Sequence, residues 1–158
     1  MKIKTTLAII TSAAVLALSA CGSSAAGEAK GPHSEARTTA FKSMMPNFSS
    51  MGKMVKGEEA YDVEKFKTAA AAFAAESQEP FKHFERDAAV DGKPQDGDAL
   101  PAVWAQPEQF KAEEDKFRAA VENLNAKAQA GNLDEIKVAY GDVGASCKAC
   151  HDTFRKPK

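Results

Sequence analysis

Apolar residues recur every three or four positions near the C-terminus, and two cysteines continue the same series. Its members are Leu133, Ile136, Tyr140, Val143, Cys147, Cys150 and Phe154. Positions three and four apart lie on one face of an α-helix. The series therefore predicts a helix from Asn132, a residue type suited to an N-cap, to about Arg155. Because the cysteines belong to the apolar face, both sulfurs should point into the fold.

The two cysteines form the run Cys147-Lys148-Ala149-Cys150-His151, a C-x-x-C-H motif. This spacing is the attachment signature of a c-type haem. On a helix, both sulfurs can form thioethers along one edge of a porphyrin, and His151 can bind the iron as the proximal ligand. A zinc site would need four ligands, and a thioredoxin-like motif would need a βαβ setting that is not evident here. We therefore predict one haem c, bound covalently through Cys147 and Cys150.

The same kind of spacing predicts three more helices, at about residues 34–56, 62–77 and 107–128. Pro46 should bend the first of them. Residues 85–106 collect Gly, Pro and Asp and are predicted to form a long loop. Sustained three-four spacing is typical of helices that cross at a shallow angle. We predict an all-α, antiparallel four-helix bundle over residues 33–158, with the covalently bound haem entering its interior near one end.

Composition narrows the function classes. The chain has 158 residues, enough for one domain, and a formal net charge of −1. It therefore offers no basic surface for nucleic acid, which we do not expect as a partner. Its three cysteines do not make a disulfide framework.

The N-terminus has the pattern of a targeting segment. Lys2 and Lys4 precede an apolar run over residues 7–18, which is too short to span a membrane comfortably. The sequence Leu-Ser-Ala-Cys at 18–21 resembles a bacterial lipobox, which implies a lipoprotein signal peptide over 1–20 and lipidation of Cys21. The alternative is ordinary cleavage after Ala20, which would leave a free thiol. Residues 21–32, rich in Gly and Ser, are predicted to be a flexible tether from the lipid anchor in the membrane.

The chain resembles cytochrome c′, the class II c-type cytochromes, in a lipoprotein form. The resemblance rests on a C-x-x-C-H motif at the C-terminal end, on the run from Gly131 to Arg155, and on Arg37-x-x-x-Phe41-Lys42 in the first helix. It covers about residues 33–158. It implies a periplasmic protein of a Gram-negative bacterium, and family members commonly pair as homodimers. By resemblance to Gram-negative lipoproteins, Gly22 after the lipidated cysteine implies the outer membrane.

The resemblance also implies how the iron is ligated. Family members with Met four residues after the first-helix Arg resemble low-spin electron carriers, and members with an apolar residue there have no sixth ligand. Here that position is Phe41. This implies a five-coordinate haem that binds nitric oxide or carbon monoxide, with His151 as the axial ligand. The alternative is that Met44 or Met45 reaches the iron, giving a six-coordinate electron carrier that works with a periplasmic electron donor.

Two arginines complete the expected site. By resemblance, Arg37 pairs with a haem propionate, the alternative being a solvated side chain. Arg155 is expected over the proximal face of the haem, where it would support nitric oxide that binds after His151 is displaced. Its alternative role is a positive charge at a helix C-terminus. No distal His-Arg pair is apparent that could cleave an O–O bond, so we do not expect an enzyme.

Overall fold

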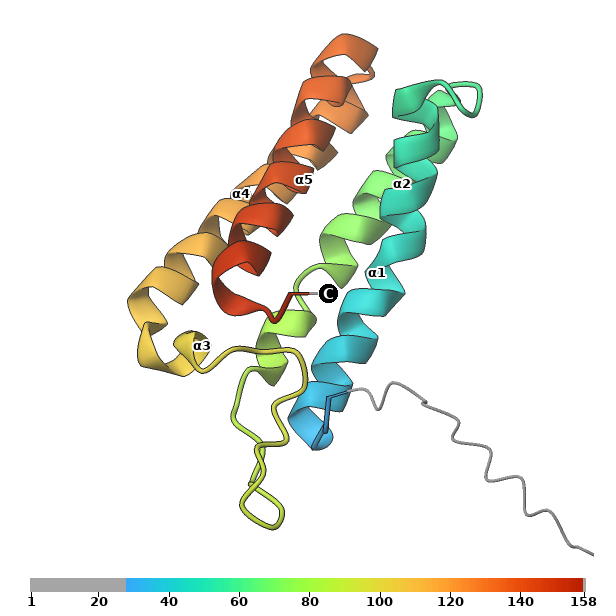
Figure 1. Cartoon of the computed structure of the whole chain (residues 1–158). Helices are drawn as coiled ribbons and strands as arrows, with labels where there is room; N and C mark the ends of the chain where they lie inside the picture. The colour runs from blue at the N-terminus through green and yellow to red at the C-terminus, as the bar shows by residue number, and fades with distance from the viewer. Residues whose placement is uncertain (1–27, 158) are drawn as a thin grey trace, which may run out of the picture.

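The computed structural model describes residues 28–157, and these fold into four long helices, two short ones and one long loop. The elements in chain order are α1 (Pro32–Lys56), α2 (Val63–Glu76), the 3-10 helix η1 (Pro80–His83), α3 (Ala102–Ala105), α4 (Pro107–Ala130) and α5 (Leu133–Phe154) (Figure 1). The prediction of an all-α fold is confirmed. The four long helices agree with the predicted ranges to within two residues at each end.

Local sequence sets the ends of these helices. Gly57 ends α1 at φ +76°, and Gly131 ends α4 at φ +80°. This left-handed region is open to glycine and is the usual way to finish a helix. The side chain of Asn132 accepts hydrogen bonds from the backbone N–H groups of Asp134 and Glu135 and so caps α5. The chain reversals before α2 and before α5 are therefore encoded by the residues at the turns.

The four long helices form two antiparallel pairs, α1 with α2 and α4 with α5, and the pairs lie beside each other as a bundle (Figure 1). Apolar side chains of all four long helices supply the core, although Val63 at the start of α2 is exposed. The buried side chains that pack together are Met44, Met51, Met54, Phe66, Ala69, Ala70, Phe73, Phe117, Val121, Leu124, Ala128, Ile136, Ala139 and Val143. Burial of each large side chain contributes about 1.5 to 3 kcal/mol to folding, so the apolar faces are what hold the bundle together.

Proline 46 lies inside α1, and the helix continues through it from Pro32 to Lys56. Proline lacks the N–H that would bond to the preceding turn. The packing of α1 against α2 and η1 outweighs this loss, because α1 buries residues on both sides of Pro46, among them Met44 and Met51.

The long loop before α4 is fixed to both ends of the folded chain. The N–H of Gly31 donates to the carbonyl of Gln95 at 2.8 Å, and the N–H of Gly97 donates to that of Ala29 at 3.0 Å. Further along the loop, the N–H of Lys156 donates to the carbonyl of Asp98 at 2.8 Å. The predicted tether over 21–32 is thus too long: its last residues pair with the loop, and Pro32 already belongs to α1.

Cys21, the predicted lipidation site, and the predicted signal peptide over 1–20 lie outside the described residues. Within residues 28–157, no helix is both long enough and apolar enough to cross a membrane.

Candidate functional site

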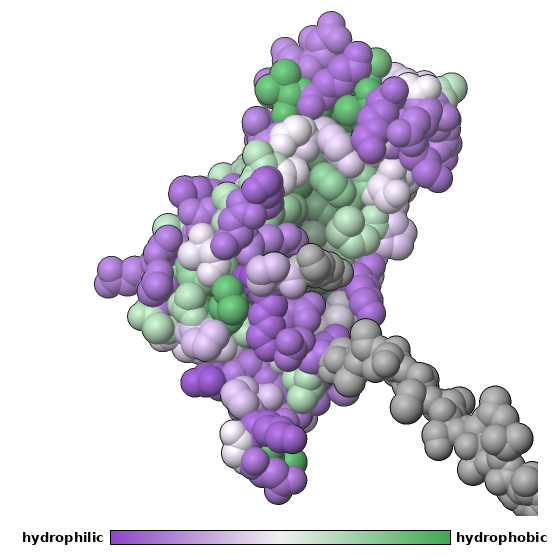
Figure 2. All heavy atoms as spheres, viewed as in Figure 1, coloured by the Kyte–Doolittle hydropathy of each residue, from purple (hydrophilic) through white to green (hydrophobic). Residues whose placement is uncertain are grey.

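A cavity of about 530 Å³ opens between the two helix pairs. Its walls come from α1, η1, α4 and α5, and Asp98 and Ala99 of the loop before α3 also line it. Figure 2 shows an apolar hollow on the face where α1 and α5 lie side by side, with hydrophilic side chains around it. The volume falls within the range of about 300 to 1,000 Å³ that ligand pockets usually have. The cavity is therefore large enough for a sizeable organic group.

The α5 wall of the cavity carries the C-x-x-C-H motif. Cys147, Cys150, His151 and Phe154 all line it, as their three-four spacing on one helical face predicts. Both cysteines are partly buried free thiols, whereas His151 is exposed. The structure thus brings together the three residues predicted to attach and ligate a haem.

The surroundings of the two thiols keep them protonated. Burial raises the pKa of Cys147. Burial, with smaller effects of Glu113 and Cys147, raises the pKa of Cys150 to about 11. Catalytic and metal-binding cysteines instead need a lowered pKa, because the thiolate is the reactive form. Within residues 28–157, no group of three or more His, Cys, Asp or Glu side chains is placed to hold a metal ion.

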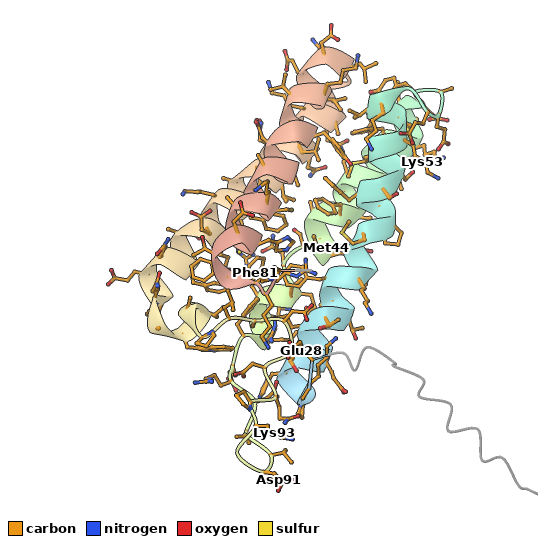
Figure 3. The ribbon with its side chains drawn as sticks, in the orientation of Figure 1. Glu28, Met44, Lys53, Phe81, Asp91 and Lys93 are labelled. Atoms are coloured by element: carbon orange, nitrogen blue, oxygen red, sulfur yellow. The ribbon has the colours of Figure 1, made fainter. Side chains whose placement is uncertain are left out.

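Phenylalanine rings line much of the rest of the cavity. Phe41 of α1 meets Phe81 edge to face at a centroid distance of 6.0 Å and Phe84 at 6.4 Å. The ring centroid of Phe110 in α4 lies 4.6 Å from that of Phe84 and 5.3 Å from that of Phe154. Phe81 is labelled in Figure 3, together with Met44 of α1. These contacts give the cavity an apolar aromatic lining, against which the flat face of a porphyrin could pack.

The segment that carries Phe81 and Phe84 is held in place by polar contacts. The indole N–H of Trp104 donates to the carbonyl of Phe84 at 2.6 Å. The guanidinium of Arg37 lies 4.7 Å from the centre of the Phe84 ring, a favourable cation–π distance. The aromatic wall therefore depends on α1 and α3 as well as on η1.

Arg37 lines the cavity but is not the solvated side chain of the alternative interpretation, since only 6% of it is exposed. Its Nη1 donates to the carbonyl of His83 at 2.6 Å, and its Nη2 donates to that of Asp96 at 2.8 Å. Burial lowers the pKa of Arg37, while Asp87, Asp96 and Asp98 act against that shift. Arg37 thus joins α1 to the loop, and its pairing with a haem propionate stays a prediction.

Arg155 follows α5 directly and also lines the cavity. Its Nη2 lies 3.8 Å from Oδ2 of Asp98, and its backbone N–H donates to the carbonyl of His151 at 3.2 Å. The loop residue Asp98 therefore restrains the Arg155 side chain, and its place over the proximal face of the haem stays a prediction.

Two methionines of α1 also line the cavity. Met44 is 3% exposed and belongs to the core, whereas Met45 is 48% exposed. Because they lie three and four residues after Phe41, all three share one side of α1. The cavity therefore holds both the ring that would cover the iron and the thioethers that could bind it.

Several cavity residues were not singled out in the sequence. Lys30, Thr38 and Asp98 line it, and so does the phenylalanine pair of residues 81 and 84. The phenylalanine pair follows Pro80, which begins a short 3-10 helix, so the two rings do not continue the three-four spacing of α2. Lys30 and Asp98 reach the site only because the loop folds back on the start of α1.

The residues present fit a c-type haem. The cavity offers two thiols and an imidazole on one helix, apolar rings on the other walls, and cationic side chains at its edge. Cys147 and Cys150 would hold the porphyrin by thioether bonds, and His151 would be the axial ligand of the iron.

Comparison with known proteins gives the same assignment. Residues 33–155 match the family model of Cytochrome C'. A cytochrome c' of Alcaligenes xylosoxydans xylosoxydans is 38% identical over 122 residues, which cover 77% of this chain and 91% of that protein.

Solved structures of cytochrome c prime from Alcaligenes xylosoxidans have the same fold. The nitric oxide complex of one mutant has a TM-score of 0.71 and 36% identity, and covers 80% of this chain and 94% of that one. A carbon monoxide-bound variant has a TM-score of 0.70 and 35% identity, and the match covers 79% of this chain and 94% of that one. The chain therefore belongs to the cytochrome c′ family, whose haem c is covalently attached.

Proposed function

We propose that this protein binds nitric oxide, and also carbon monoxide, at a five-coordinate haem iron, and that it scavenges or buffers nitric oxide. The observation that carries the proposal is the position of Phe41, whose ring lies in the cavity that also contains Cys147, Cys150 and His151. The haem would supply a ferrous iron with one open coordination position. The relatives captured with nitric oxide and carbon monoxide support this choice of ligand.

Phe41 would keep the open position free of protein donors. Its side chain has no lone pair, and Phe81 and Phe84 pack against its ring. Thr38, one turn earlier, also lines the cavity, but its hydroxyl donates to the carbonyl of Ser34 at 2.7 Å. An apolar surrounding without a free hydroxyl donor favours a neutral diatomic over an anionic ligand, whose charge would lack stabilisation.

The two arginines would act at the edges of this site. Arg37 would contribute a hydrogen bond to a haem propionate through the donors that its two carbonyl contacts leave over. Arg155 would support nitric oxide on the His151 side. An Arg155→Ala variant is expected to change the rate of nitric oxide binding on that side, and an unchanged rate would contradict the role.

A one-electron carrier is the second candidate function, favoured by the presence of Met44 and Met45 in the cavity. In a carrier, one of these thioethers would be the sixth ligand and the iron would be low-spin. The exposure of Met45 leaves it freer to move than Met44, which is packed in the core.

We propose that the protein is not an enzyme. Peroxide cleavage needs a distal acid–base histidine with an arginine beside it. Among the described residues that line the cavity, His151 is the one histidine, and it belongs to the attachment motif.

We further propose that the protein is a periplasmic lipoprotein of a Gram-negative bacterium, anchored through Cys21 to the outer membrane and paired as a homodimer. Lys30 lines the cavity, so the tether joins the fold beside the haem site. Labelling of wild-type cells and of a Cys21→Ser strain with a fatty acid tests the anchor. Label in the wild type alone supports it, and an unlabelled wild type contradicts it.

Absorption spectra of the ferrous holoprotein test the main proposal. We expect a high-spin five-coordinate spectrum that changes on addition of nitric oxide and, separately, of carbon monoxide. A resting ferric spectrum with the long-wavelength band of a thioether-ligated iron would contradict it. Met44→Leu and Met45→Leu are matched controls, because both should leave the spectrum of a five-coordinate protein unchanged.

A further inference from the structure

The charged side chains that line the cavity are not balanced. Four are cationic, namely Lys30, Arg37, Lys42 and Arg155, and two are acidic, namely Asp98 and Glu113. The cavity lining therefore has an excess of two positive charges. A haem brings two propionate carboxylates into the same cavity, so its charge would offset that excess.

Two of the four cations already have acidic neighbours within the fold. Arg155 faces Asp98, and the charge of Arg37 is partly offset by Asp87, Asp96 and Asp98. Glu113 is likewise paired, with Nζ of Lys116 at 2.7 Å. Neither arginine therefore supplies the uncompensated charge.

Lys30 and Lys42 are the cations left over. Among residues 28–157, no carboxylate oxygen lies within 4.0 Å of either ammonium group, and neither side chain makes a hydrogen bond with a described residue. Lys42 directly follows Phe41 on α1. Lys30 reaches the cavity because residues 29–31 pair with the loop.

The side chain of Lys30 packs against Gly97 of the loop. Gly97 has φ +61°, and a Cβ at this position would lie 3.3 Å from Cγ of Lys30. The lysine stem thus lies directly over the glycine. A partly ordered ammonium group loses less entropy on binding a carboxylate than a free one would.

We propose that Lys30 and Lys42 bind the two propionate carboxylates of the haem. A carboxylate that leaves water for a partly buried site costs free energy unless a cation or hydrogen-bond donors meet it. The thioether edge of the haem would then lie on α5, and the propionate edge would lie against α1 and the residues just before it. The inference rests on the covalent haem and holds whichever gas, or none, binds to the iron.

Infrared difference spectra between the oxidised and reduced holoprotein test this assignment. Cells fed with aminolevulinate that carries ¹³C in its carboxyl group yield haem with labelled propionates, so the label identifies the propionate bands. We expect Lys30→Gln and Lys42→Gln each to shift a labelled carboxylate band, and the double variant to shift both. The pH at which a band is lost by protonation should rise by about one unit, because a nearby cation lowers a carboxyl pKa.

Lys148→Gln is the matched control. Lys148 lies between the two attachment cysteines but pairs with Asp152 and does not line the cavity. The labelled propionate bands of the Lys148→Gln protein should match those of the wild type. Unchanged bands in the double variant would overturn the proposal, and so would equal shifts in all three single variants, since these would reflect a general loss of positive charge.

Discussion

Phe41 is the residue on which the choice between gas binding and electron transfer depends. It lies on the cavity side of α1 with Phe81 and Phe84 packed against it, and Met44 and Met45 follow within one turn. A benzyl group at this place would block the haem iron sterically without bonding to it. A thioether of similar length would bond to the iron.

We predict that Phe41→Met converts the haem iron from five-coordinate to six-coordinate. The ferrous spectrum should become low-spin, and the rate of carbon monoxide binding should fall because the ligand must displace the thioether. Stopped-flow absorption measures both. Phe48→Met is the control, because Phe48 lies two turns further along α1 and outside the cavity lining. A Phe41→Met protein that remains high-spin would contradict this position for the sixth ligand.

At the scale of elements, the start of α1 is capped by a residue far away in the chain. Gly31 has no side chain to cap the helix. Instead Asp87 of the loop accepts hydrogen bonds from the backbone N–H of His33 and of Ser34, both at 2.8 Å. A carboxylate at a helix N-terminus is also favoured by the helix dipole. The loop therefore fixes the end of α1 that leads to Arg37 and Phe41.

This cap predicts a specific acid sensitivity. Burial alone would raise the pKa of Asp87, which is 8% exposed, but the hydrogen bonds from His33 and Ser34 outweigh it and the net pKa is lowered. The folded state therefore prefers the ionised carboxyl. Its stabilisation is complete above the unfolded pKa, about 4, and is lost as the pH falls through the lower folded value.

We predict that Asp87→Asn lowers the free energy of unfolding by about 1–3 kcal/mol at pH 7, and that its difference from the wild type shrinks below about pH 4. Urea unfolding of the holoprotein across this pH range measures both effects. Asp91→Asn, an exposed change in the same loop, should match the wild type throughout. A constant difference between Asp87→Asn and wild type at all pH values would contradict the ionised cap.

At the scale of the whole molecule, one close contact joins α1 to α5 outside the cavity. The hydroxyl of Tyr140 donates to the carbonyl of Phe48 at 3.2 Å, and the two rings stack at 4.4 Å. A Cβ at Gly52 would lie 2.3 Å from the Tyr140 oxygen. The glycine thus lets the two helix pairs approach, while the cavity keeps them apart elsewhere.

We predict that Gly52→Ala destabilises the holoprotein by about 1–3 kcal/mol, because the added methyl group overpacks this contact. Gly141→Ala is the matched control: a Cβ there would meet no atom within 4 Å, so the better helix propensity of Ala should stabilise the protein by up to about 1 kcal/mol. Thermal unfolding followed by circular dichroism compares them. Adding Tyr140→Phe should recover part of the loss in Gly52→Ala, and no recovery would show that the clash lies elsewhere.

The sequence by itself determined the helices and the attachment motif, because both depend on local spacing. Asn132, Gly57 and Gly131 encode helix ends, and the apolar series from Leu133 to Phe154 carries the cysteines to the interior. These signals act over one or two helical turns, so no knowledge of distant residues is needed to predict them.

Only the tertiary structure decided how the rest of the site is built. The predicted loop over 85–106 contributes Asp96 and Asp98, and its neighbours Phe81 and Phe84 form a cavity wall. Arg37 is buried because the loop folds over it, and Lys30 belongs to the site instead of to the tether. These placements come from hydrogen bonds between residues about 60 to 70 positions apart. Local propensity does not encode such pairings, and they form only when the packing of the four helices has brought the segments together.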